Sequence, residues 1–173
     1  MQICDVTLTI SSDLPVWPGD PAIRFERVSD VNAGDTVTLS RLETGSHIGT
    51  HVDAPVHFIR GGRGVDALEL DVLIGPCYVA HALEADVIDA ALLDRLGIPP
   101  ATSRLLIRTR NSDRWARGDS RFHADFVAID RSGAEWIVER GLKLIGVDYM
   151  SVAPFDATIP THDILLRANV IVI

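Results

Sequence analysis

The stretch from Gly45 to Phe58 constrains this chain more than any other part of it, because it holds three of the six histidines and an aspartate. These residues are His47, His51, Asp53 and His57. Imidazole and carboxylate are the ligand types that suit zinc and neighbouring divalent metals. All four positions are odd-numbered, so in an extended segment their side chains point to one face. A lone histidine is more often a surface or core residue, but this grouping predicts a metal site.

The spacing of His47 and His51 limits the backbone that can bring them together. In a straight strand their Cα atoms would be ~13 Å apart, too far for two imidazoles to share one ion. A helix would bring them together, but the glycine, proline and β-branched residues of the stretch disfavour it. We therefore predict a bulge or tight bend at Gly49–Thr50. A second bend at 53–55 is expected to turn His57 back toward the same site.

Length and composition are those of a soluble, single-domain protein. The 173 residues are 47% hydrophobic and 23% charged, which allows a sizeable core. The net charge of -8 argues against nucleic acid or an anionic membrane as a partner. The sequence shows no signal peptide and no apolar run of transmembrane length. Cys4 and Cys77 could pair, but without a C-x-x-C spacing they are expected to stay reduced, in the cytoplasm.

Hydrophobic patterning by itself predicts a mixed α/β fold with many short strands. Asp86 is the expected N-cap of a helix that runs to about Leu96. Ser132 and Glu135 are expected to form a capping box for a second helix ending near Gly141. The Gly45–Phe58 stretch is expected to continue the sheet. Strands are expected at 2–10, 23–31, 36–43, 77–83, 104–109, 126–130, 144–148 and 169–173.

Three loops carry residues of possible functional interest. Trp17 lies in the proline-rich segment 14–21, where it could form a wall of a substrate site or fill the core, and the residues alone leave both roles open. The glycine-rich loop 60–64 lacks the Gly-Lys-Ser/Thr of a phosphate loop, so we expect a mobile loop beside the metal cleft with solvated arginines. The long polar loop with Arg114, Trp115 and His123 could line a cleft, whereas His81 is expected to be structural.

Residues 47–57 resemble the H-x-G-T-H-x-D-x-P-x-H signature of the cyclase-type metal-dependent hydrolases, a family that includes bacterial kynurenine formamidases (arylformamidases) and isatin hydrolases. The loop around Trp17 is similar to the T-P-x-W-P-G-D loop of the kynurenine formamidases. Two further segments, around Asp148 and around His162, resemble the family's G-x-D-x-x-S and second-metal segments. The resemblance implies an α/β fold with a central mixed, barrel-like sheet of the swivelling β/β/α type, flanking helices, and a homodimer.

The resemblance also implies a chemistry. His47, His51 and Asp53 would bind one divalent ion, and Asp53 could bridge to a second ion bound by His162. Zinc is the expected metal, as one or two ions, with manganese as the alternative. The ions would activate water for attack on an amide. In this reading His57 is the general acid-base for the leaving nitrogen.

The expected substrate is a small-molecule amide, N-formyl-L-kynurenine, which would be cleaved to kynurenine and formate in tryptophan catabolism. Trp17 would contact its aryl ring, and Asp148 would have a supporting polar role. Two other functions stay open. One is hydrolysis of a cyclic amide such as isatin or of another small cyclase-family substrate, and the other is metal binding without catalysis.

Metal binding without catalysis is considered because of the C-terminal end of the chain. A glutamate ligand of the kynurenine formamidases would fall just beyond Ile173. The expectation is therefore a single cyclase-type domain over residues 1–173 that lacks the C-terminal part of the family domain. A shortened protein, a role for the terminal carboxylate of Ile173, and loss of activity are the three explanations that this leaves.

Overall fold

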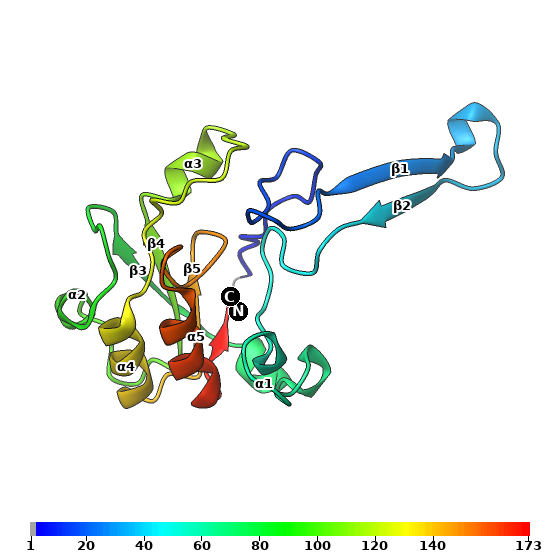
Figure 1. Ribbon diagram of the computed structural model, residues 1–173. Helices are drawn as coiled ribbons and strands as arrows, with labels where there is room; N and C mark the ends of the chain where they lie inside the picture. The colour runs from blue at the N-terminus through cyan, green and yellow to red at the C-terminus, as the bar shows by residue number, and fades with distance from the viewer. Residues whose placement is uncertain (1–2) are drawn as a thin grey trace. The chain divides into compact units, whose positions relative to one another are not determined.

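The computed structural model describes residues 3–173, which form two compact units (Figure 1). The first unit runs to His51 and includes Ser120–Phe122, and the second comprises Val52–Asp119 and His123–Ile173. The first contains a two-stranded antiparallel sheet and the second a four-stranded parallel sheet with helices. The predicted mixed α/β class is confirmed, with the antiparallel and parallel pairings in separate sheets.

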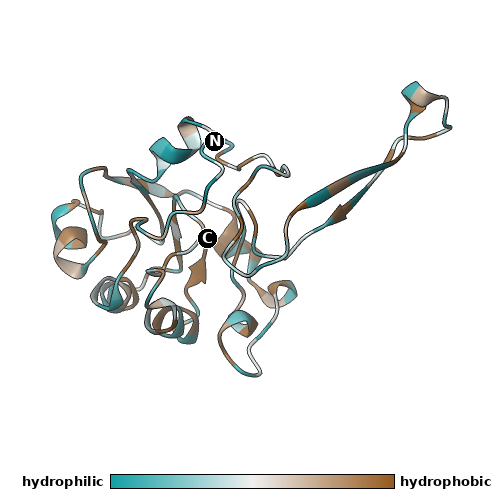
Figure 2. Cartoon of the chain, turned by 45° about the horizontal axis from the view of Figure 1, so that its top comes forward, coloured by the Kyte–Doolittle hydropathy of each residue, from teal (hydrophilic) through white to brown (hydrophobic). Residues whose placement is uncertain are grey.

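The first unit is built around the hairpin of β1 (Arg24–Ser29) and β2 (Leu39–Glu43). The strands are joined by the 3-10 helix η1 (Val31–Ala33) and by Gly34, whose φ of 98° suits glycine. Figure 2 shows both hydrophilic and hydrophobic residues along the hairpin, and the strands expected at 23–31 and 36–43 are confirmed.

The strand expected at 2–10 is wrong for the described residues, because 3–10 contain no strand, and Gln2 lies outside them. Side chains satisfy part of this backbone instead of a neighbouring strand. The amide of Thr7 donates to the Asp5 carboxylate, and that of Leu8 donates to the hydroxyl of Thr50. Such local bonds compete with a ladder.

The sheet of the second unit has the linear order β3 (Tyr78–Ala82), β4 (Arg104–Thr109), β5 (Leu144–Val147) and β6 (Ile171–Val172), and each neighbouring pair is parallel. The strands expected at 77–83, 104–109, 144–148 and 169–173 are confirmed by these four. Parallel strands are normally covered on both faces, and Leu105, Ile107 and Ile145 are fully buried here.

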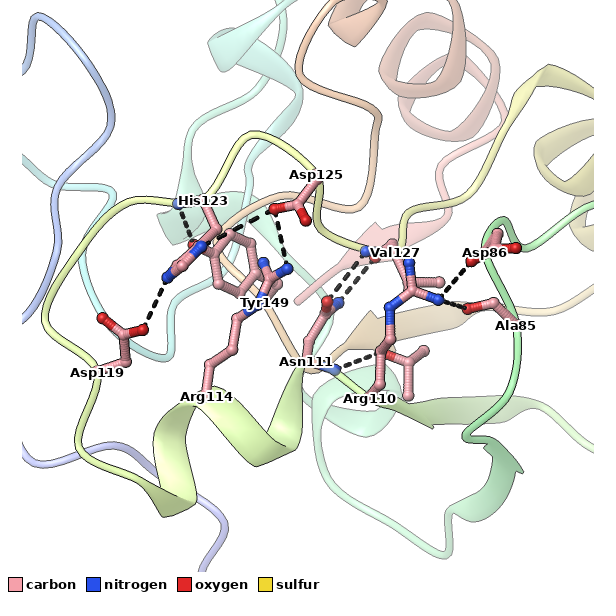
Figure 3. Close-up of polar contacts among 11 residues, drawn as sticks. Ala85, Asp86, Arg110, Asn111, Arg114, Asp119, His123, Asp125, Val127 and Tyr149 are labelled. Atoms are coloured by element: carbon pink, nitrogen blue, oxygen red, sulfur yellow. Dashed lines mark hydrogen bonds and ion pairs between the residues drawn. The ribbon is translucent and has the colours of Figure 1, made fainter.

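The strand expected at 126–130 is wrong. Residues 126–129 are buried, as their apolar pattern required, but Ile129 makes only an isolated bridge with Ile88. The Asn111 side chain donates to the carbonyl of Val127 and accepts from its amide, which Figure 3 shows. Because one side chain satisfies both backbone groups, Val127 does not need a neighbouring strand.

Helices pack with the parallel sheet and complete the core. The fully buried helix residues Leu93, Ile137 and Leu165 belong to the same apolar cluster as the central strands. Within residues 3–173, no helix combines the length and the apolar character that crossing a bilayer would need. The helices are α1 (Leu70–Leu73), α2 (Ala90–Arg95), α3 (Ser112–Ala116), α4 (Arg131–Glu139) and α5 (Thr158–Arg167), with 3-10 turns η2 (Pro55–His57) and η3 (Val65–Ala67).

The helices expected near 86–96 and 132–141 exist, but both expected N-caps are wrong. Asp89 caps α2 by accepting from the amide of Leu92 at 2.7 Å, and Asp130 caps α4 by accepting from the amide of Gly133 at 2.8 Å. Asp86 instead forms an ion pair with Arg110 (Figure 3). Several acids and hydroxyls lie close together before each helix, so residue type alone does not select the cap.

Asp89→Ala is expected to lower the free energy of unfolding by about 1 kcal/mol, because it leaves an amide of the first turn of α2 without its acceptor. Asp86→Ala should cost less, since the Asp86 side chain is 89% exposed and exposed ion pairs contribute little. Urea denaturation of both variants measures the difference. An equal or larger loss for Asp86→Ala would instead identify Asp86 as the cap.

Candidate metal centre

The segment that carries the expected metal ligands bends at Gly49–Thr50, where a bend was expected to bring His47 and His51 close enough to share an ion. Gly49 has a φ of 54°, in the left-handed region that favours glycine, and bends occur at 46–47 and 49–50. This brings the ring centroids of His47 and His51 to 5.1 Å. The expected continuation of the sheet is wrong, since among the described residues 44–54 only Asp53 makes a β-bridge, with Val172.

Three of the expected ligands come together. His47, His51 and Asp53 each offer one ligand atom, and these atoms lie within 4.8 Å of one another. Ligands bound to a common ion at roughly 2.1 Å lie at most about 4.2 Å apart, so a small movement of these side chains would let all three bind one ion. His57 does not belong to the group, so the single face expected for all four residues holds three of them.

Backbone carbonyls orient two of the histidine rings. Nδ1 of His51 lies 3.0 Å from the carbonyl oxygen of Gly49, and Nδ1 of His162 lies 2.7 Å from that of Thr158. A carbonyl oxygen can only accept, so Nδ1 carries the hydrogen in both rings and Nε2 is the potential ligand atom. Metal-binding histidines are commonly held in this way. The donor set therefore fits a divalent metal.

His162 lies beside the carboxylate of Asp53. It is on α5 and only 2% exposed, with Nε2 3.4 Å from Oδ2 of Asp53. Its ring stacks on Phe58, with centroids 4.0 Å apart. The alternative of a surface histidine on a helix face is wrong. Asp53 is also buried, and a buried carboxylate is costly unless cations or hydrogen-bond donors surround it.

His57 is exposed at the end of η2, where the chain turns after Asp53 as expected. Its ring meets that of Phe58 edge-on at 4.5 Å. The glycine-rich loop lies against this turn, because a Cβ on Gly62 would come within 2.6 Å of the Pro55 backbone. Arg63 of the loop is exposed, as expected, and donates to the side chain of Asn169 at 2.8 Å.

Asp148 joins the end of β4 to the start of α3. Its carboxylate accepts from the amide and hydroxyl of Thr109 at 2.7 and 2.8 Å, and from those of Ser112 at 3.0 and 2.6 Å. Its carbonyl accepts from the indole N–H of Trp115 at 2.8 Å. This arrangement agrees with a supporting polar role and fixes α3 at the carboxyl edge of the parallel sheet.

Sequence reasoning missed a polar network that begins on α3, a short helix in the segment that was expected to be a loop. It consists of Arg114, Asp119, His123, Asp125 and Tyr149, of which Figure 3 shows the contacts. Asp119 and His123 stand four residues apart, but this spacing predicts a contact only on a helix, and both residues lie in a loop. Their side chains meet at 2.8 Å.

A cavity of about 470 Å³ lies beside Asp53 in the second unit. Sequence reasoning gave no signal for it, because its walls come from separate parts of the chain. Basic and acidic side chains both line it, so it has no strong preference for one sign of charge. They are Arg63, Arg104, Lys143, Asp53, Glu69 and Asp71.

Trp17, the expected substrate contact, is half-buried in an irregular loop of the first unit. Its ring lies edge-to-face on that of Phe122, with centroids 5.2 Å apart and planes at 73°. Trp17 is therefore not fully buried, unlike a residue that only fills the core.

The chain belongs to the cyclase family, since the family model described as putative cyclase matches residues 4–154. The kynurenine formamidase of Erythrobacter litoralis is 33% identical over 174 residues, which cover 96% of this chain and 74% of that protein. Cyclase-like protein 3 of Oryza sativa subsp. japonica is 35% identical over 99% of this chain and 66% of its own length. The chain thus spans about two thirds of the length of such curated relatives.

Solved structures show the same fold. A structure titled as a potential metal-dependent hydrolase with cyclase activity has a TM-score of 0.80 at 27% identity, over 98% of this chain and 78% of that one. Isatin hydrolase A from Ralstonia solanacearum has a TM-score of 0.77 at 22% identity, over 98% and 76% of the two chains. The family resemblance expected from residues 47–57 is confirmed.

Proposed function

We propose that residues 1–173 form a cyclase-type domain that hydrolyses an amide with the help of a bound divalent metal. The observation that carries this proposal is the buried carboxylate of Asp53. It is grouped with His47 and His51, and it lies 3.4 Å from Nε2 of His162. Such a cluster of imidazoles around an acid is typical of metal sites with hydrolytic chemistry.

Each side chain has a role in this proposal. His47, His51 and Asp53 would hold one ion, and Asp53 with His162 would hold a second. A bound divalent ion supplies Lewis acidity and makes water a nucleophile at neutral pH. Zinc suits these ligands, and manganese is the alternative. The carbonyls of Gly49 and Thr158 keep the Nε2 atoms of His51 and His162 available for coordination.

His57 would transfer the proton to the leaving nitrogen. It is exposed on the turn that directly follows Asp53, so it can reach a substrate without serving as a ligand. Imidazole exchanges protons near neutral pH, which suits general acid-base catalysis. Phe58 would help to hold it, since its ring contacts both His57 and the buried His162.

The proposed substrate is N-formyl-L-kynurenine, cleaved to L-kynurenine and formate in tryptophan catabolism. The relative named kynurenine formamidase supports this choice, and so does Trp17, an aromatic residue that is only half-buried. We also propose a cytoplasmic homodimer. The thiols of Cys4 and Cys77 are free, as in a reducing compartment, and exposed apolar side chains of the hairpin offer a surface that a second copy would cover.

Metal analysis together with turnover tests the proposal. We expect one or two ions per chain by elemental analysis, cleavage of N-formyl-L-kynurenine, loss of cleavage after chelation, and recovery with zinc or manganese. If isatin is turned over faster than N-formyl-L-kynurenine, the activity is that of a cyclic-amide hydrolase and not of a formamidase. Full metal occupancy without turnover of either amide would leave a metal-binding protein without catalysis.

A further inference from the structure

Phe122 is an aromatic residue of the segment 120–122 in the first unit. It lies far from Trp17 in the sequence, yet the two aromatic rings are in contact in the first unit. Their edge-to-face arrangement, at 5.2 Å and 73°, is the one that the quadrupoles of two aromatic rings favour. Both side chains are half-buried. The contact therefore restrains the indole of Trp17, a residue that is not fully buried.

A short loop presents Phe122. Asp119 and His123 flank its tip, residues 120–122, and Nε2 of His123 lies 2.8 Å from Oδ2 of Asp119 (Figure 3). A carboxylate can only accept, so Nε2 carries the hydrogen. The two side chains are 25% and 18% exposed, which limits competition from water. The bond closes the loop at its neck.

Tyr149 fixes the base of this loop. Its hydroxyl accepts from the backbone amide of His123 at 2.8 Å, and its ring stacks on Phe126 with centroids 4.7 Å apart. The guanidinium of Arg114 lies over the ring of Tyr149 and donates to Asp125 at 3.0 Å. The base therefore has polar and aromatic contacts on several sides, although the loop has no regular secondary structure.

Trp17 itself lies in a loop with neither helix nor strand. An aromatic wall binds a flat substrate more tightly when its plane is held before the substrate arrives. We propose that Phe122, presented by the loop that Asp119 and His123 close, is the positioning residue that orients Trp17 toward the aryl group of the substrate. This inference rests on the proposed function, and it gives the loop a role in selecting aryl amides.

A double-mutant cycle with Trp17 tests the inference. Phe122→Leu should raise KM for N-formyl-L-kynurenine about three- to tenfold and leave kcat within about twofold, because it removes an edge-to-face contact and little area. Phe122→Tyr should restore the parental KM. In a Trp17→Ala background, Phe122→Leu should add no further change, since its effect acts through Trp17.

A variant of Asp119, which closes the loop by its bond to His123, provides a second test. Asp119→Ala should raise KM in the same way, whereas Asp113→Ala, which removes an exposed acid of α3, should not. Binding of L-kynurenine, followed by calorimetry, should weaken in parallel without any turnover being needed. The metal content of every variant should match that of the parent.

Two kinds of failure can be told apart. If the parent protein neither cleaves N-formyl-L-kynurenine nor binds L-kynurenine, the proposed function fails and the role of Phe122 fails with it. If the parent does both and Phe122→Leu leaves KM unchanged, only the positioning role is overturned. Additive effects of Phe122→Leu and Trp17→Ala would overturn it as well.

Discussion

Asp53→Asn is expected to abolish metal binding and to reduce amide hydrolysis by about a thousandfold. Asp53 is the residue on which the candidate ligands converge, with His47 and His51 in one group and His162 at 3.4 Å. Lewis-acid stabilisation of a transition state is worth several kcal/mol, and about 1.4 kcal/mol corresponds to tenfold in rate. Asparagine keeps the shape of the side chain but removes the charge that a cation needs.

The fold should survive this change, because the backbone bond from the Asp53 amide to the Val172 carbonyl does not involve the side chain. Elemental analysis, turnover of N-formyl-L-kynurenine and the circular dichroism spectrum measure the three effects. Asp66→Asn, at an exposed position, is the matched control and should retain both metal and activity. Unchanged metal content in Asp53→Asn would contradict the proposed ligand set.

The metal centre could be predicted where its chemistry is local. His47, His51 and Asp53 lie within one short segment, so spacing and reach were enough to expect a bend at Gly49. The long-range member, His162, was found through the family resemblance. Nothing in its own helix shows that α5 turns this residue toward Asp53.

The errors in the fold have a common physical cause. Periodicity reports which residues are buried, and it correctly placed 126–129 in the interior. It does not report which group satisfies the backbone. At Val127 that group is the side chain of Asn111, and at the start of α4 it is Asp130 and not Ser132. The pair of Asp119 and His123 also depends on a loop conformation that residue patterns do not specify.

His57→Gln is expected to lower turnover of N-formyl-L-kynurenine by about 10²- to 10⁴-fold while the metal content stays unchanged, because general acid-base catalysis contributes an effect of that size. We expect turnover to fall without loss of metal because His57 is exposed and lies outside the group of His47, His51 and Asp53. The same substitution at the exposed His81 is the control and should change neither quantity. Loss of metal together with activity would make His57 a ligand, and unchanged turnover would remove it from the chemistry.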